Sequence, residues 1–258
     1  MKIVRTKLLV ASAALLWAVS AAADWPKPQA AAAGVSQGGE EDYLRGLRYA
    51  DGVGVPRDYA VAARYYRMAA QKGYIAAQYN LAWLLENGVG VKQDLQEAAV
   101  WYRKAAEQGD AESQNNLGTL YATGHGVLRD DAEAVRWYTL AAKQEDPEGL
   151  TNLAMMYLQG RGVKRDPPRA FRLCRQAAEA GHPAARQNLA LMYANGDGVE
   201  RDYVAAYVWM DLAAGEMDSA ASLRDRLAKE MTPDQLARAR DLAAQKRKPT
   251  NTPKKEKP

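Results

Sequence analysis

The sequence contains a single cysteine and two histidines among its 258 residues. One cysteine cannot form an intrachain disulfide framework or a metal site with several cysteine ligands, and two histidines leave little room for a zinc or iron centre. Phenylalanine is almost absent, with one residue, although the chain has 14 tyrosines and 6 tryptophans. Alanine is abundant, and alanine favours helix over sheet. The composition predicts a soluble helical protein without a metal ion or cofactor.

The basic net charge of +4 belongs to the two ends of the chain rather than to its body. The first 23 residues carry +3 and residues 246–258 carry +5, so residues 24–245 carry −4. A nucleic-acid-binding domain is normally basic, because it has to neutralise phosphates. The acidic body therefore argues against nucleic acid as a partner.

Residues 1–23 have the pattern of a secretory signal peptide. A basic start is followed by an apolar run from Leu8 to Val19 and by the small residues Ala21, Ala22 and Ala23, which are typical of a cleavage site. The run is shorter than the roughly 20 residues that span a bilayer, and no later segment is apolar enough to do so. We expect the mature chain to begin near Asp24, without stable membrane insertion, in the periplasm or outside the cell.

Two further segments lack the periodicity of a folded element. Residues 24–39 mix proline, glycine and alanine, which predicts a flexible leader. Residues 246–258 are basic, interrupted by proline and free of large apolar residues, which predicts a disordered tail. The tail either keeps the protein soluble or makes weak contact with anionic polymers of the cell envelope.

The central part of the sequence repeats every 36 residues. Pairs of glycines separated by one residue mark the repeats, and an aspartate follows each pair at a fixed distance. The pairs are Gly52/Gly54, Gly88/Gly90, Gly124/Gly126, Gly160/Gly162 and Gly196/Gly198, and the aspartates are Asp58, Asp94, Asp130, Asp166 and Asp202. A repeat period of 20–50 residues is typical of a solenoid or array.

Each repeat reads as two helices joined by a glycine-containing turn. In the second repeat, apolar residues at helical spacing end at Gly88, and glycine is favoured just past a helix end. Asp94 and Glu97 then form the start signal of a second helix, a variant of the capping box. One helix pair cannot bury its apolar side alone, so successive pairs are expected to stack. Tryptophans of the second helices would lie in the resulting core, namely Trp101, Trp137 and Trp209.

The repeat resembles the Sel-one-like repeat family, which is similar to the tetratricopeptide repeats. The third repeat carries the pattern in full: Leu117-Gly118, Tyr121, Gly124, Gly126-Val127, Asp130, Ala134, Trp137-Tyr138 and Ala141-Ala142. The resemblance implies an all-α, right-handed α/α superhelical solenoid that serves as a scaffold for other proteins. Five repeats would cover residues 40–215, and capping helices would follow over residues 216–245, the last beginning at Thr232.

The remaining reactive residues give little reason to expect catalysis. The sequence has no nucleophile-elbow, phosphate-loop or zinc-protease motif. Leu173 and Cys174 replace the Trp-Tyr pair of the fourth repeat, so we expect Cys174 to be a buried, unreactive thiol. His125 and His182 are expected to be surface residues rather than ligands.

The best candidate binding site is a ladder of asparagines, one in the first helix of each of four repeats. Its members are Asn80, Asn116, Asn152 and Asn188, and the residues three positions later, which vary, are Trp83, Thr119, Met155 and Leu191. By analogy with tetratricopeptide repeats, these residues would line a concave face. Amides both donate and accept hydrogen bonds, so the ladder could hold the backbone of an extended peptide. Alternatively, each asparagine could fix the stacking of neighbouring repeats.

Two functions remain open from the sequence. The first is a non-enzymatic envelope scaffold or adaptor that binds a protein or peptide on its concave face. The second is a cell-wall-binding protein or envelope hydrolase, which the export signal, the aromatic residues and the basic tail would suit.

Overall fold

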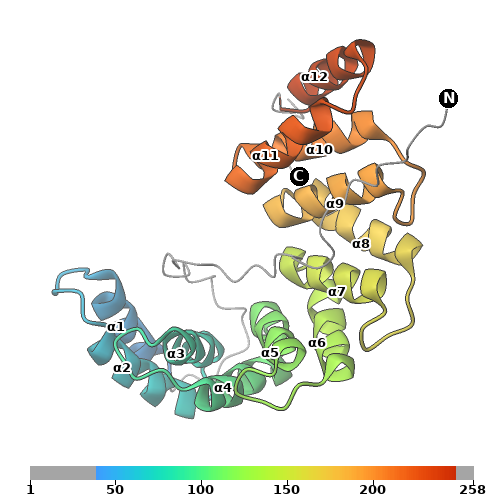
Figure 1. Cartoon of the computed structure of the whole chain (residues 1–258). Coiled ribbons are helices and arrows are strands. Elements are labelled where there is room, and N and C mark those ends of the chain that lie inside the picture. The colour runs from blue at the N-terminus through green and yellow to red at the C-terminus, as the bar shows by residue number, and fades with distance from the viewer. Residues whose placement is uncertain (1–38, 248–258) are drawn as a thin grey trace, which may run out of the picture. The chain divides into compact units, whose positions relative to one another are not determined.

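The structure is a computed structural model that describes residues 39–247, and these residues form twelve α-helices and no strand (Figure 1). This confirms the all-α prediction. The predicted signal peptide, nearly all of the leader and residues 248–258 of the tail lie outside the described residues. The helices are α1 (Glu40–Asp51), α2 (Tyr59–Gln71), α3 (Ile75–Asn87), α4 (Leu95–Glu107), α5 (Ala111–Thr123), α6 (Asp131–Lys143), α7 (Pro147–Gln159), α8 (Pro167–Glu179), α9 (Pro183–Asn195), α10 (Tyr203–Ala214), α11 (Asp218–Ala228) and α12 (Pro233–Arg247).

The helix boundaries lie where the repeated glycines and aspartates predict them. Each first helix, such as α3, ends at a glycine in the left-handed conformation, for which Gly88 has a φ of 67°. Each second helix begins after the repeated aspartate, and Asp94 accepts a hydrogen bond from the backbone N–H of Glu97 at 2.8 Å. Glu145 keeps a left-handed φ of 61° at a repeat end where other repeats have glycine. The local signals of the sequence are therefore sufficient to place the helices.

The described residues fall into two compact units, which divide at residue 165. The first unit contains α1–α7 and the second contains α8–α12. Within the first unit, α3, α5 and α7 lie toward the inside of a bend and α2, α4 and α6 toward the outside (Figure 1). The first helices of three successive repeats thus form one side of this unit.

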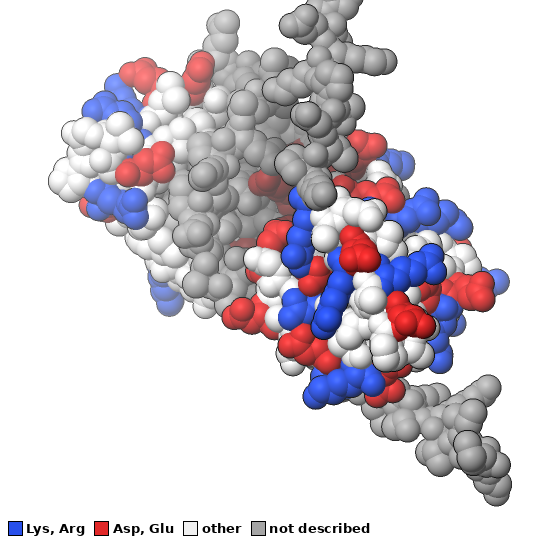
Figure 2. Space-filling model, turned by 90° about the horizontal axis from the view of Figure 1, so that it is seen from above, with Lys and Arg blue, Asp and Glu red and all other residues white. Residues whose placement is uncertain are grey.

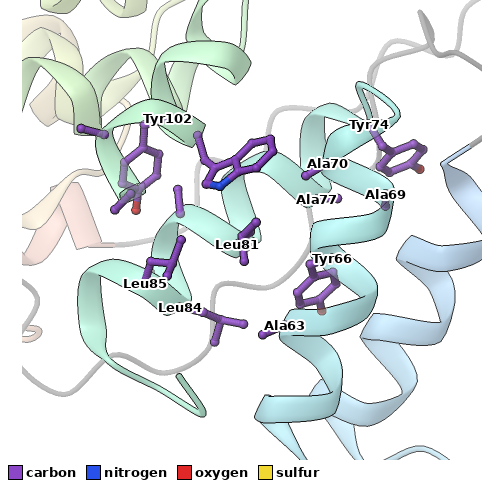
Figure 3. Packing of buried hydrophobic residues seen from close by; sticks show 14 of the residues in the cluster. Ala63, Tyr66, Ala69, Ala70, Tyr74, Ala77, Leu81, Leu84, Leu85 and Tyr102 are labelled. Carbon is purple, nitrogen blue, oxygen red and sulfur yellow. The ribbon is translucent and has the colours of Figure 1, made fainter. Parts of the chain in front are cut away.

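Tyrosines and small alanines form the core of the first unit. Tyr66, Tyr102 and Tyr138 occupy equivalent positions of successive repeats and are fully buried. Figure 3 shows Tyr66 and Leu81 among alanines, with Leu84 and Leu85 on the same helix as Leu81. Burying one such large side chain contributes about 1.5–3 kcal/mol. Alanines let the helices approach closely, and the tyrosines fill the space between them.

The tryptophans predicted to lie in the core are buried, which confirms that assignment. Trp101, Trp137 and Trp209 are 6%, 3% and 8% exposed. Cys174 is also buried, its thiol donates to the carbonyl of Ala185 at 3.3 Å, and burial raises its pKa to about 12. A thiol with such a raised pKa is an unreactive core group. His125 is exposed, whereas His182 is half-buried directly before α9, and burial lowers its pKa.

Amide side chains connect neighbouring repeats of the first unit. Gln78 and Gln114 lie at equivalent positions of α3 and α5 and are buried. Each donates to a carbonyl at the end of the preceding second helix, namely Gln78 to Ala70 at 3.2 Å and Gln114 to Ala106 at 3.0 Å. Each of these carbonyls also accepts a backbone hydrogen bond just past the helix end, so the glutamine adds a second bond that comes from the next repeat.

The C-terminal helices pack against α10 in the second unit. Asp211 of α10 is buried and accepts hydrogen bonds from Arg224 of α11 and Arg247 of α12. The predicted capping box is present, because Thr232 and Gln235 each bond the other's backbone N–H. Helix α12 runs to Arg247, so it includes two residues that the sequence pattern assigned to the tail.

The second glycine of each loop after the first packs against the preceding repeat. A Cβ atom on Gly126 would overlap the carbonyl group of Leu95, at the start of α4, and Gly90 and Gly162 meet α2 and α6 in the same way. Gly54 belongs to the first repeat, and only the end of the Arg48 side chain lies near it. Both Gly54 and Gly126 have a φ above 70°, so they differ in packing rather than in backbone conformation.

This difference yields a stability prediction. Gly54→Ala should cost about 1–2 kcal/mol of unfolding free energy, because alanine is strained at positive φ. Gly126→Ala should cost a further 1–3 kcal/mol or so, because the methyl group overlaps α4. Urea unfolding followed by circular dichroism measures both values. Equal losses in the two variants would show that the loop glycines do not mediate the contact between repeats.

Candidate functional site

The four asparagines of the ladder do not share one environment. Asn80 is 2% exposed and lies beside the hydroxyls of Tyr43 and Tyr66 in the core. Asn116 and Asn152 are half-buried on α5 and α7. Asn188 is half-buried on α9 in the second unit. The first unit therefore presents two ladder asparagines at its surface and keeps one in its interior.

Asn80 and Asn116 each lie beside the hydroxyl of a tyrosine from the preceding second helix. Tyr66 lies 14 positions before Asn80, and Tyr102, at the same distance before Asn116, has that asparagine beside its hydroxyl. This arrangement fits the structural role that the sequence left open for the ladder. Cys174 stands 14 positions before Asn188, so this asparagine has a thiol where the others have a phenol.

Asn115, which is not a member of the ladder, joins Asn116 and Asn152. Its Nδ2 donates to Glu148 Oε2 at 3.0 Å and lies 3.4 Å from Asn116 Oδ1, and its Oδ1 accepts from Asn152 Nδ2 at 2.8 Å. The network links α5 to α7. We call the side of the first unit formed by α3, α5 and α7 the first-helix face.

The residues three positions after the asparagines are half-buried. Trp83, Thr119 and Met155 belong to the first-helix face, whereas Leu191 lies on α9 of the second unit. Thr119 is tied into the fold, because its hydroxyl lies 3.1 Å from that of Tyr138 and donates to the carbonyl of Asn115. Trp83 and Met155 offer apolar contacts of different shape on the same face.

Two glutamates of the face have perturbed acidity. Partial loss of water contact, together with the carboxylates of Asp146 and Glu112, raises the pKa of Glu148 to about 7. Burial and the nearby Asp110 also raise the pKa of Glu112, which interacts with the hydroxyl of Tyr79. Repulsion between like charges disfavours ionisation of both groups.

The sequence pattern did not identify this polar network as a site. Position 115 and its equivalents carry tyrosine, asparagine, threonine and glutamine, so a search for repeated residues passes over it. Glu112 and Glu148 are 36 residues apart, so the sequence shows that they occupy equivalent positions. Acidic residues are common in the first turn of a helix because they interact favourably with the helix dipole. Their equivalence alone therefore does not indicate a binding site.

The described residues contain no group of three or more histidine, cysteine, aspartate or glutamate side chains placed to hold a metal ion. Among the same residues, none of the helices combines the length and apolar character required to cross a membrane.

Comparison with known proteins identifies the repeat. The Sel1 repeat model matches residues 43–74, 75–110, 111–146, 147–182 and 183–215. A Sel1 repeat protein from Oxalobacter formigenes is 33% identical, with a TM-score of 0.69, and the match covers 81% of this chain and 88% of that protein. No curated protein matches the sequence significantly.

Two further solved structures are similar. The protective antigen c5321 of uropathogenic Escherichia coli strains, which has an SLR fold, is 34% identical with a TM-score of 0.69. That match covers 81% of this chain but only 46% of the antigen. The immunity protein Pa5087 of Pseudomonas aeruginosa is 20% identical over 82% of this chain and 81% of that protein, with a TM-score of 0.51, and shows the fold alone.

The acidity of Glu148 generates a pH prediction. Folding raises the pKa of the Glu148 carboxyl from 4.5 to about 7, so the folded protein holds this proton more tightly than the unfolded chain does. The resulting contribution to the free energy of unfolding is fully present below about pH 4.5 and is lost as the pH rises through 7. Glu148→Gln should therefore gain stability relative to the unmodified protein as the pH rises from 4.5 to 8, by a modest amount because solvent screens the exposed side chain.

Urea unfolding at several pH values measures this gain. Glu107→Gln, which removes the charge of an exposed glutamate of α4, is the charge-matched control. A stability difference between Glu148→Gln and the unmodified protein that stays constant between pH 4.5 and 8 would contradict the raised pKa.

Proposed function

The chain belongs to the Sel1 repeat family, and we propose that it is a non-enzymatic scaffold that binds a protein or peptide on its first-helix face. Sel1 repeat proteins generally mediate protein–protein interaction, and the repeat is typically non-catalytic. The partner surface proposed here is the one on which Asn116 and Asn152 lie.

The observation that carries this proposal is the amide network between α5 and α7, in which Asn116 and Asn152 are half-buried and Asn115 is buried. Asn115, Asn116 and Asn152 come from two successive repeats and are connected by side-chain hydrogen bonds. Amide groups can donate to and accept from a peptide backbone. Half-buried Trp83 and Met155 on the same face supply apolar contact area. Apolar contact area combined with a few placed polar groups is typical of binding sites.

The proposed location is the periplasm or the cell exterior, and the pattern of residues 1–23 supports it. The alternative is a cell-wall-binding protein or envelope hydrolase, and the export signal, the aromatic residues and the basic residues 246–258 are the features in its favour. Contact between these residues and anionic envelope polymers could add to binding on the first-helix face, because the two use different parts of the chain.

Site-specific cross-linking tests the binding face. A photoreactive phenylalanine analogue at Met155 should capture a partner in living cells, whereas the same group at Val100, which is exposed on α4 in the layer of second helices, should not. Asn116→Ala with Asn152→Ala should reduce capture about tenfold, since two or more hydrogen bonds of about 0.5–1.5 kcal/mol each are lost.

The matched control replaces two exposed amides on second helices, outside the first-helix face. Gln96→Ala with Gln176→Ala changes the same number of amides on α4 and α8 and should leave capture unchanged. Equal capture from Met155 and Val100, or capture that survives loss of Asn116 and Asn152, would remove the first-helix face from the proposal.

The location is tested separately by mass spectrometry of the protein recovered from fractionated cells. A chain that begins near Asp24 in the periplasmic or secreted fraction is the expected result. A chain that retains residues 1–23 in the cytosol would refute the proposed location without bearing on the binding face.

A further inference from the structure

The charged residues that α3, α5 and α7 themselves contribute to the first-helix face have one sign, although Arg103 of α4 reaches Tyr121 of α5. Helices α3, α5 and α7 contain Glu86, Glu112 and Glu148 and no lysine or arginine. The second helices of the same unit carry its cations, among them Arg103, Lys104, Arg136 and Lys143. The C-terminal helices differ, because lysine, arginine, aspartate and glutamate are interspersed on the near end of the view in Figure 2.

The acidic side chains of the face repel one another. Glu112 and Glu148 occupy the same position in successive repeats, and burial together with neighbouring carboxylates raises both pKa values. The carboxylates that act on Glu148 are Asp146, the N-cap of α7, and Glu112 of α5. Asp110 acts in the same direction on Glu112. A positive group placed here would relieve this repulsion, which makes the face complementary to a cation.

A protein partner could bring such cations to the amides. Asn115 links the two features, because it donates to Glu148 and accepts from Asn152. The groups that would hold a peptide backbone and the groups that would hold a cation are therefore adjacent. We infer that the first-helix face binds an extended, basic segment of a partner protein, with lysine or arginine side chains on Glu112 and Glu148. This inference rests on the proposed function.

The repeat geometry sets the spacing of the basic residues. Packed helices lie about 8–10 Å apart, so equivalent side chains of α5 and α7 are separated by about that distance. An extended peptide advances about 3.3 Å per residue. Two cations that meet Glu112 and Glu148 would therefore be about three residues apart in the partner sequence.

Selection from a random peptide library tests this inference without knowledge of the partner. The protein from Asp24 to Pro258 is immobilised at low salt, where ion pairs are least screened, and peptides of about twelve residues are enriched. The expected products carry two or more lysines or arginines at three-residue spacing. Glu112→Gln with Glu148→Gln should weaken binding of the enriched peptides about tenfold and reduce its salt dependence.

The control removes two charges elsewhere. Glu107→Gln with Glu200→Gln changes two exposed glutamates outside the first-helix face and should leave affinity unchanged. Circular dichroism confirms that both double variants are folded. Equal loss of affinity in the two double variants would mean that only net charge matters and would overturn the inference.

The remaining outcomes separate this inference from the proposed function. Enriched peptides without basic residues, whose binding depends on Asn116 and Asn152, would overturn the inference and leave the proposed function standing. Failure to enrich any peptide would count against both. Enrichment only after removal of residues 248–258 would make this basic segment of the chain the occupant and would overturn the assignment to a partner.

Discussion

Contact between successive helix pairs is the interaction on which the rest of the structure depends. Each pair has more apolar surface than it can cover itself, and the next pair covers the remainder. Fully buried tyrosines at equivalent positions, Tyr66, Tyr102 and Tyr138, mark these contacts in the first unit. The close approach is possible because the second loop glycine places backbone directly against the preceding repeat. Stacking therefore determines which residues of each repeat are free to vary.

Polar contacts between repeats involve both helices of each repeat. An ion pair between second helices joins Arg67 to Glu97. On the first helices, Gln78 and Gln114 donate to the preceding repeat, and the amide network with Glu148 joins α5 to α7. Because the network mixes amides with carboxylates of raised pKa, it can offer a partner both backbone hydrogen bonds and negative charge.

The sequence predicted the fold in detail because its signals are local and repeated. Glycines such as Gly88 end helices, and aspartates such as Asp94 begin them, without reference to the rest of the chain. The site was less accessible, since it depends on residues that meet only after stacking. Asn80 and Asn116 look equivalent in the sequence, but Asn80 is buried in the core and Asn116 is half-buried. The positions equivalent to Asn115 in other repeats carry other residue types, so periodicity could not identify it.

The ladder asparagines therefore differ in whether a partner could reach them. Asn80 is a core residue, so substituting it would change stability rather than binding. Asn116 and Asn152 are half-buried and linked to a carboxylate, so they combine a structural contact with access to a partner. The structural and functional readings of the ladder are thus compatible, since one position of the repeat can serve stacking in one copy and recognition in another.

Comparison of one repeat with the first unit tests the dependence on stacking most directly. Residues 75–110 form one repeat, and residues 39–165 form the compact first unit. Circular dichroism with thermal unfolding should show that the single repeat is largely unfolded, because its apolar sides are uncovered, whereas residues 39–165 are helical and unfold cooperatively. A single repeat that is as helical and as stable as the unit would contradict this account.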